Sequence, residues 1–340
     1  MAGPLFTQQL TQLAHCLEKR EPLLDAEHQA ALRLLNGYYE GFPDIQVDLF
    51  GKTLVIYNNA RRPDDFSDLS YSLQAFYLNK MTWITAVLVK SRYAADEIDR
   101  QGQLTFGTEL DDEITEHGLR YALDLRINQD ASFYLDTRNL RKWLLENAAD
   151  KTVLNTFAYT GSLGLAAKIS AAKRVVQTDV NQRFLWLAKQ SFRLNQFAVS
   201  PAGFLSGDFF KIVQRFRNAN ALFDFVILDP PFFSQTGAGR VDLLHEFTRL
   251  VNKVRPIIGH EGRLIAINNA LFASGKEVLQ QVDKLCETGY VQLEQLIPVP
   301  EDVTGYPETI VDHPPVDPAP FNHPTKIMIL KILRKDQRTA

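Results

Sequence analysis

The spacing of apolar positions separates a short first region from a longer second region. Up to Leu35, apolar residues recur at three- and four-residue intervals, which predicts a helical leader over residues 1–35. From Ile45 the period changes to two, and apolar positions on both sides of Gly51 predict a β-hairpin. A predicted helix over residues 69–78 and a strand over residues 83–89 complete a small α/β unit.

A regular alternation of strand and helix patterns fills the rest of the chain. The expected strands are 121–127, 152–157, 174–178, 202–206, 223–228, 262–268, 292–298 and 326–333, and the expected helices are 138–147, 163–171, 183–195, 209–216, 243–254 and 276–286. Such alternation predicts a doubly wound parallel sheet of the Rossmann-like type. No helix separates the last two strands, so an antiparallel finish is expected.

The acidic stretch Glu109–Glu113 marks the expected border between the two regions. We therefore predict an accessory α/β domain over residues 1–115 and the doubly wound domain over residues 116–340. At 340 residues the chain is long enough for two domains.

Composition narrows the class of protein. The formal net charge is −3, which excludes a strongly electropositive nucleic-acid binder but not a locally basic surface. Two distant cysteines, Cys16 and Cys286, argue against a disulfide framework or a zinc site. The chain shows no signal peptide and no apolar run of membrane-spanning length, so a cytoplasmic location is expected, with no membrane and no metal partner. A homodimer is compatible with these features.

Small residues follow the first strand of the second region. The turn there reads Ala158-Tyr-Thr-Gly161, and Gly161 and Gly164 allow close approach of a ligand and of the next helix. The G-x-G-x-x-G fingerprint of dinucleotide-binding proteins is absent, which disfavours a nicotinamide dehydrogenase. Ligands of open α/β sheets bind at this edge, beyond the carboxyl ends of the strands.

Acidic residues end the next three strands. Asp179 follows the second strand, where a carboxylate can accept the ribose hydroxyls of an adenosine; the alternative is that it caps the helix starting near Gln182. Gly207-Asp208 ends the third strand, where a carboxylate or the backbone could meet an adenine amine. Asp229-Pro230-Pro231 ends the fourth, directly after an apolar strand, and the two prolines make that turn stiff.

The set Asn155-Thr-Phe-Ala-Tyr-Thr-Gly-Ser162, Asp179, Gly207-Asp208 and Asp229-Pro-Pro-Phe-Phe-Ser234 resembles class I S-adenosylmethionine-dependent methyltransferases. Within that class it is most similar to bacterial large-subunit ribosomal RNA methyltransferases with a D-P-P-x-F motif. Segments upstream resemble the same enzymes, and the similarity covers about residues 30 to 335. The additional RNA-binding module usual at the front of these enzymes is not expected here, because only a short helical leader precedes the region of similarity.

The resemblance implies S-adenosylmethionine as the cofactor. It places the segment Phe133–Arg138 over the cofactor, with Arg138 at its carboxylate and Asp136 at its ammonium; the alternative is a surface Asp–Arg pair. The residues expected to bind the cofactor are Tyr134, Asp136, Arg138, Asn155, Phe157, Ala158, Tyr159, Thr160, Gly161, Asp179, Val180, Gly207, Asp208, Phe209 and Asp229.

The absence of a thiol near the expected site limits which atoms can accept the methyl group. Methylation at carbon 5 of a pyrimidine needs a cysteine thiolate, and the relevant positions read Pro231-Phe232 and Asn268-Asn269. The expected catalytic residues are Asp229, Pro230, Pro231 and Phe232. The expected substrate-binding residues are Phe233, Asn268 and Asn269, although an Asn pair can also simply form a turn.

The missing thiol favours a nitrogen acceptor, and the resemblance implies a purine nitrogen in ribosomal RNA, either guanine N7 or an exocyclic amine. Three alternatives stay open: a protein substrate, a small-molecule substrate, and a non-catalytic RNA-binding factor that retains the cofactor pocket.

Overall fold

The computed structural model describes residues 7–61, 67–231, 233–236 and 239–335. Contacts within the chain group these residues into two compact units. The first unit comprises residues up to Leu135 together with Pro300–Pro314, and the second comprises Asp136–Val299 together with the residues from Pro315 onward. The chain therefore passes from one unit to the other three times.

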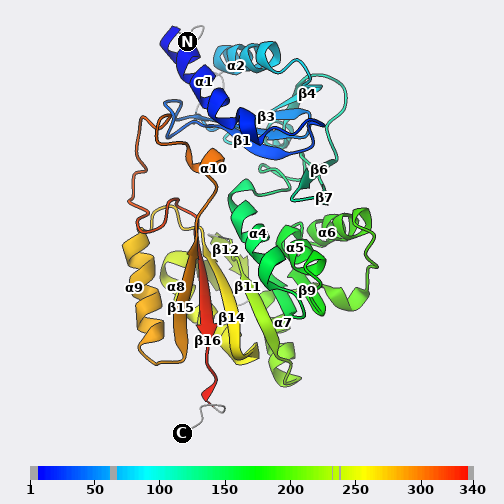
Figure 1. Cartoon of the computed structure of the whole chain (residues 1–340), viewed down its shortest axis with the longest axis vertical. Coiled ribbons are helices and arrows are strands. Elements are labelled where there is room, and N and C mark those ends of the chain that lie inside the picture. The colour runs from blue at the N-terminus through cyan, green and yellow to red at the C-terminus, as the bar shows by residue number, and fades with distance from the viewer. Residues whose placement is uncertain (1–6, 62–66, 232, 237–238, 336–340) are drawn as a thin grey trace. The chain divides into compact units, whose positions relative to one another are not determined.

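The first unit is built on a five-stranded sheet in the order β1-β2-β3-β4-β5 (Figure 1). Strands β3 and β4 are parallel, whereas the other neighbours are antiparallel. A hairpin of β6 and β7 follows. The elements of this unit are α1 (Thr7–Arg20), β1 (Ala31–Asn36), β2 (Ile45–Phe50), β3 (Thr53–Asn58), α2 (Ser67–Lys80), β4 (Ala86–Ser91), α3 (Glu97–Gln101), β5 (Gln103–Phe106), β6 (Glu113–Glu116), β7 (Leu119–Ala122) and α10 (Glu301–Thr304).

The helical leader expected over residues 1–35 is wrong in its second half. Helix α1 ends at Arg20, and Ala31–Asn36 forms strand β1, which pairs antiparallel with β2. Nearly every residue of β1 is buried, and a strand buried on both faces has the same unbroken apolar composition as a buried helix. The local pattern therefore could not separate the two structures.

The border between the units differs from the one expected at residue 115. The hairpin of β6 and β7 lies in the first unit, where the Thr115 backbone N–H donates to the Gln29 carbonyl at 2.8 Å. The strand expected over residues 121–127 is shorter, because β7 ends at Ala122.

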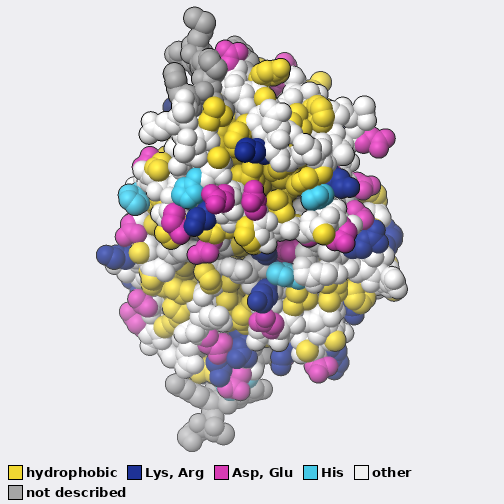
Figure 2. Space-filling model, turned by 45° about the horizontal axis from the view of Figure 1, so that its top comes forward, with side chains coloured by type: hydrophobic (Ala, Val, Ile, Leu, Met, Phe, Trp, Pro, Cys, Tyr) yellow, Lys and Arg dark blue, Asp and Glu magenta, His cyan; other side chains and the backbone are white. Residues whose placement is uncertain are grey.

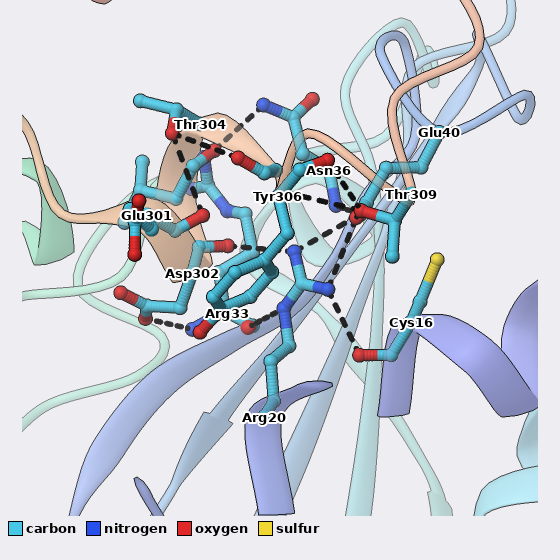
Figure 3. Close-up of polar contacts among 12 residues, drawn as sticks. Cys16, Arg20, Arg33, Asn36, Glu40, Glu301, Asp302, Thr304, Tyr306 and Thr309 are labelled. Carbon is cyan, nitrogen blue, oxygen red and sulfur yellow. Dashed lines mark hydrogen bonds and ion pairs between the residues drawn. The ribbon is translucent and has the colours of Figure 1, made fainter. Parts of the chain in front are cut away.

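A fully buried ion pair joins three separate segments of the first unit (Figure 3). Arg20 at the end of α1 donates from both Nη atoms to the Glu40 carboxylate at 3.0 Å. The same guanidinium donates to the carbonyls of Cys16, Arg33 and Asp302 at 2.7 to 2.9 Å, so all five of its N–H groups are used. The segment 300–314 is thereby attached to the first unit although it lies late in the sequence.

The second unit is a doubly wound α/β fold. Its seven-stranded sheet has the order β10-β9-β8-β11-β14-β16-β15, in which β16 runs antiparallel to both neighbours and the other printed pairs are parallel. The elements are α4 (Arg138–Asn147), β8 (Thr152–Thr156), α5 (Ser162–Ile169), β9 (Arg174–Asp179), α6 (Gln182–Leu194), β10 (Phe204–Ser206), α7 (Phe209–Asn218), β11 (Phe223–Leu228), β12 (Phe233–Thr236), β13 (Gly239–Asp242), α8 (Leu243–Val254), β14 (Ile258–Asn268), α9 (Gly275–Cys286), β15 (Val291–Ile297) and β16 (Lys326–Ile332).

Alternate residues of the central strands pack against two different helical layers. In β11, Phe225 and Ile227 contact the cluster formed with α4 and α5, whereas Val226 and Leu228 contact the cluster formed with α7, α8 and α9. Strands buried on both faces explain the continuous apolar runs of the sequence. The predicted Rossmann-like sheet with an antiparallel final strand is confirmed.

Candidate active site

Four neighbouring parallel strands end level with one another at one edge of the sheet. Thr156 at the end of β8 lies opposite Thr178 of β9 and Leu228 of β11, and Leu228 lies opposite Ala266 of β14. The residues that follow these positions therefore share the carboxyl edge of the sheet, the edge at which open α/β folds bind ligands. The predicted turn, Asp179, Asp229 and the Asn pair all start from this edge.

The turn between β8 and α5 has an unusual backbone. Phe157 (φ 53°) and Tyr159 (φ 50°) adopt the left-handed region, and Gly161 follows with φ 78°. A Cβ on Gly161 would lie 2.6 Å from the Ala188 Cβ, so glycine is required there. Left-handed conformations at non-glycine residues cost energy and cluster at functional sites. This turn can therefore bring backbone N–H groups close to a ligand.

The Asp179 carboxylate fixes the turn and the start of the next helix. One carboxylate oxygen accepts the Tyr159 N–H and the other accepts the Asn181 N–H, both at 2.9 Å. The cap of α6 is Asn181, whose side chain accepts the Arg183 N–H at 2.9 Å. The alternative that Asp179 caps this helix is therefore wrong. Each carboxylate oxygen retains acceptor capacity, which two ribose hydroxyls could use.

Burial raises the pKa of Asp179, although its backbone hydrogen bonds act in the opposite direction. The neighbouring Val180 side chain is 70% exposed, so it can lie against a ligand at this edge. These placements agree with a cofactor-binding role, which stays a prediction for both residues.

Gly207 and Asp208 lie where the third strand ends, next to Asp179. The Gly207 N–H donates to the Asp179 carbonyl at 3.0 Å, and the Asp208 carboxylate caps α7 by accepting the Lys211 N–H at 3.1 Å. Phe209 is buried in α7 and its ring stacks on Phe157, with 4.7 Å between centroids. The side chains of Asp208 and Phe209 thus have structural contacts, and their contact with a cofactor stays a prediction.

Three further predicted cofactor residues, Asn155, Ala158 and Thr160, are buried inside the sheet or the turn. The Asn155 side chain is buried and donates to the Gln177 amide oxygen at 3.2 Å. Gln177 occupies the space beside Gly161 and Gly164. Thr160 is also buried, whereas the Ala158 N–H donates to the Thr178 carbonyl at 2.9 Å. These contacts hold the turn against β9.

Asp229 has the most perturbed acid–base chemistry at this edge. Its pKa rises from the usual 3.8 to about 8, first because burial disfavours the charged form and second because the Asp136 carboxylate lies near it. Asp136 in turn accepts the Thr325 hydroxyl at 2.8 Å. A cation close to both carboxyl groups would favour their charged forms.

The segment around Asp136 is divided between the two units. Arg138 begins α4 in the second unit, close in sequence to Asp136, whereas Tyr134 is 43% exposed and belongs to the first unit. Their predicted contacts with the cofactor stay predictions.

The Pro-Pro turn is described only in part. Pro230 is buried and Pro231 is exposed. Phe232 lies outside the described residues. Phe233 begins β12, where it pairs with Asp242 of β13; the sequence did not predict this hairpin.

The Asn pair at the end of β14 leaves two polar atoms unsatisfied. The Asn268 amide oxygen accepts the Ala270 N–H at 3.0 Å, as in a turn. Among the described residues, the buried Asn268 Nδ2 and the buried Asn269 Oδ1 have no hydrogen-bond partner. A buried donor and acceptor without partners are costly, so their retention needs an explanation. A ligand with complementary polar groups provides one.

Lys326 is a residue of this edge that the sequence analysis missed. It is paired with Asn268 in the β14–β16 register, and its Nζ donates to the carbonyls of Ala270 and Pro324 at 3.1 and 2.7 Å. Burial lowers its pKa to about 8. The only signal in the sequence was a lysine at the start of a strand that is apolar except for one further lysine, Lys331.

Neither cysteine lies at this edge. Cys16 is buried in α1 of the first unit, and burial raises its pKa to about 12. Cys286 ends α9, directly before β15 starts at the opposite edge of the sheet. Within the described part of the chain, no cluster of His, Cys, Asp or Glu is arranged to hold a metal, and no helix is long and apolar enough to span a bilayer.

Comparison with solved structures supports the fold. A Streptococcus mutans protein described as a SAM-dependent methyltransferase aligns with a TM-score of 0.81 at 20% identity, covering 95% of this chain and 80% of that one. A Pyrococcus abyssi Trm5b structure aligns with a TM-score of 0.55 at 13% identity, covering 91% of this chain and 81% of that one.

Sequence comparison identifies relatives named for ribosomal RNA. Ribosomal RNA large subunit methyltransferase I of Erwinia tasmaniensis is 33% identical over 209 residues, 59% of this chain and 51% of the relative. A Bacillus subtilis protein provisionally named a ribosomal RNA large subunit methyltransferase, YwbD, is 27% identical over 317 residues, 88% of this chain and 77% of that one. The chain thus spans about half the length of the first of these relatives.

The profile of the S-adenosylmethionine-dependent methyltransferase family matches residues 33–302, which include most of both units. The strained turn, the two carboxylates that follow β9 and β11, and the doubly wound sheet agree with that match. This chain belongs to the S-adenosylmethionine-dependent methyltransferase family.

Proposed function

We propose that this protein transfers a methyl group from S-adenosylmethionine to a purine nitrogen, guanine N7 or an exocyclic amine, in large-subunit ribosomal RNA. The observation that carries the proposal is the unsatisfied donor and acceptor of Asn268 and Asn269, located at the same sheet edge as Asp229. The names of the relatives support RNA as the substrate.

The residues of this edge fit the cofactor. S-adenosylmethionine, when bound, supplies an electrophilic methyl group on a positively charged sulfur. Asp136 and Asp229 would hold its cationic groups, because the Asp136 carboxylate disfavours ionisation of Asp229 and a cation near both groups would favour it. Asp179 would accept the ribose hydroxyls. The strained turn after β8 would lie along the cofactor.

The Asn pair would hold the purine. Each Asn side chain has an NH2 group that donates hydrogen bonds and a carbonyl oxygen that accepts them. A purine carries acceptor and donor atoms side by side, so it can pair with both kinds of group. Base binding would satisfy the Nδ2 of Asn268 and the Oδ1 of Asn269, which have no partner among the described residues. Lys326 supports this segment by holding the Ala270 carbonyl.

Asp229 would act at the reacting nitrogen. For an exocyclic amine, the nitrogen lone pair forms the new N–C bond while the S–C bond breaks, and the nitrogen then loses a proton. The bound cation would favour the ionised form of Asp229, whose carboxylate could then accept that proton. The Pro230 carbonyl could accept a second N–H, and Phe232 or Phe233 would stack on the base.

The location of the two cysteines supports nitrogen rather than pyrimidine carbon 5 as the acceptor. Attack at carbon 5 requires a thiolate next to the base. Cys286 precedes the opposite edge of the sheet, and Cys16 is buried in the first unit.

The test is transfer of labelled methyl groups to 23S ribosomal RNA from a strain that lacks this protein, followed by digestion to nucleosides. We expect label in a methylated purine. Label in 5-methylcytidine would contradict the purine assignment. Transfer to protein alone, or cofactor binding without any transfer to RNA, would overturn the proposed function.

Two variants assign the roles. If the acceptor is an exocyclic amine, Asp229→Asn should lower the transfer rate at least about 100-fold, the usual contribution of a general base. Guanine N7 carries no proton, so its methylation should depend far less on this carboxylate. Asn269→Ala should raise the KM for RNA more than it lowers kcat. The matched control is Asp283→Asn on the exposed face of α9, which removes a carboxylate of the same unit away from the edge and should leave both constants unchanged.

A further inference from the structure

One segment of the second unit is strongly basic although the whole chain is acidic. Residues 168–217 contain nine Lys and Arg but only two acidic residues, Asp179 and Asp208, a formal +7 in a chain whose total is −3. The segment runs from the end of α5 through α6 and β10 to the end of α7. On the face drawn in Figure 2, Lys and Arg side chains are interspersed with Asp and Glu side chains.

The two carboxylates of this segment are occupied by backbone groups. Asp179 accepts the N–H groups of Tyr159 and Asn181, and Asp208 accepts that of Lys211. Within the described part of the chain, the exposed side chains of Arg193, Lys211 and Arg215 have no carboxylate at ion-pair distance. The charges of these three side chains are therefore available to a ligand.

On the outer face of α6, an aromatic side chain, Trp186, lies between two arginines. Arg183, Trp186, Gln190 and Arg193 recur at three- and four-residue intervals, which places them along one side of the helix. The opposite side is formed by the buried residues Leu185, Leu187, Ala188, Ser191 and Phe192. Trp186 is 56% exposed, although burying an indole is normally favourable.

Helix α7 carries further cationic side chains next to β10, the outermost strand of the sheet. Strand β10, the edge strand, is entered from α6 and left toward α7. Lys211 and Arg215 lie one helical turn apart on the exposed face of α7, whose other face is buried. Cationic side chains of α6 and α7 therefore lie before and after β10 in the chain. Because β10 has only three residues, it offers few backbone groups for pairing with another strand.

We propose that the outer face of α6 (Arg183, Trp186, Arg193) and the exposed face of α7 (Lys211, Arg215) bind single-stranded RNA. The cations contact backbone phosphates, and Trp186 stacks on an unpaired base. This inference rests on the proposed function, since it gives the surface by which the RNA substrate is held beside the carboxyl edge. It also accounts for RNA binding by a chain with a net negative charge.

The test measures binding of a fluorescent oligoadenylate at several KCl concentrations. Arg183→Glu/Arg193→Glu should lower the affinity at least about tenfold and make the slope of log K against log salt shallower by about 1.4, as expected from two lost phosphate contacts on a single strand. Trp186→Ala should lower the affinity about tenfold or more without changing this slope, because no charge is removed.

The matched control is Lys142→Glu/Lys284→Glu, which makes the same charge change at exposed positions of α4 and α9. This control should retain the affinity of the wild type to within about threefold, given the screening of distant surface charges. Equal losses in both double variants, or unchanged binding in the α6 variants, would overturn the proposal. Failure of the wild type to bind the oligoadenylate would overturn it as well.

Binding and transfer separate this inference from the proposed function. If the wild type transfers no methyl group to ribosomal RNA but binds RNA through α6, the proposed function fails and the surface stands. If the wild type methylates RNA and the α6 variants do so equally well, only the surface fails. S-adenosylmethionine binding by each variant, expected to be unchanged, verifies that the variants are folded.

Discussion

Each of the two units contains a pair of neighbouring ionisable groups, which are of opposite charge in the first unit and both acidic in the second. In the first unit, Arg20 and Glu40 are fully buried, and each charge is matched by the other and by further hydrogen bonds. In the second unit, Asp229 lies near Asp136, another carboxyl group, and its pKa rises to about 8. Full compensation is typical of a structural role, whereas an unbalanced carboxyl pair stores unfavourable energy that a cationic ligand can relieve.

The largest expected effect is on the compensated pair. Arg20→Met leaves the buried Glu40 carboxylate without its partner, which should lower the free energy of unfolding by about 3–5 kcal/mol. Denaturant unfolding measures this change. Arg20→Met/Glu40→Leu should recover much of the loss, because removing both charges removes the desolvation cost. A single variant as stable as the wild type would show that the pair does not hold the segment 300–314.

A smaller effect is expected at Asp179. Asp179→Ala should weaken S-adenosylmethionine binding by about 1.5–3 kcal/mol, the loss typical of hydrogen bonds to a charged group. Equilibrium dialysis or calorimetry measures the dissociation constant. The matched control is Asn181→Ala, which removes the cap of α6 and should lower stability by about 1 kcal/mol with little effect on the cofactor. Equal cofactor affinities of the Asp179 variant and the wild type would contradict a cofactor-binding role and would show that Asp179 only holds backbone N–H groups.

The smallest effect concerns stability against pH. The pKa of Asp229 is raised in the folded state, so its contribution to stability is greatest below about pH 4 and is lost as the pH rises toward 8. Asp229→Asn cannot ionise, and it should therefore raise the Tm by a few degrees at pH 9 while changing it little at pH 4. Thermal unfolding of the cofactor-free protein measures this difference. A rise that is the same at both pH values would mean that the carboxylate is not the cause.

The doubly wound sheet could be predicted because its strands are buried on both faces and its helices have one apolar side. The same burial made Ala31–Asn36 ambiguous, since its neighbours β2 and the segment 300–314 come later in the chain. The hairpin of β12 and β13 was missed because nothing in its short sequence alternates clearly.

The edge of the sheet was predictable because the order of parallel strands brings their carboxyl ends together. The roles of single residues were not, because they depend on contacts across the sheet. For example, both Asp179 and Asn181 could have capped α6, and only the structure shows that the Asn181 side chain accepts the Arg183 N–H. The burial of Lys326 beside Asn268 depends on the antiparallel pairing of β14 and β16.

The central claim is that Asp229 and Asp136 form a site for the cationic cofactor, and the most direct measurement is the number of protons exchanged when S-adenosylmethionine binds. Calorimetry at pH 7 in buffers with different ionisation enthalpies gives this number. With a pKa of about 8, Asp229 is mostly protonated before binding, and a nearby cation favours its ionisation. The wild type should therefore release nearly one proton more than Asp229→Asn. Equal proton exchange in the two proteins would contradict the claim.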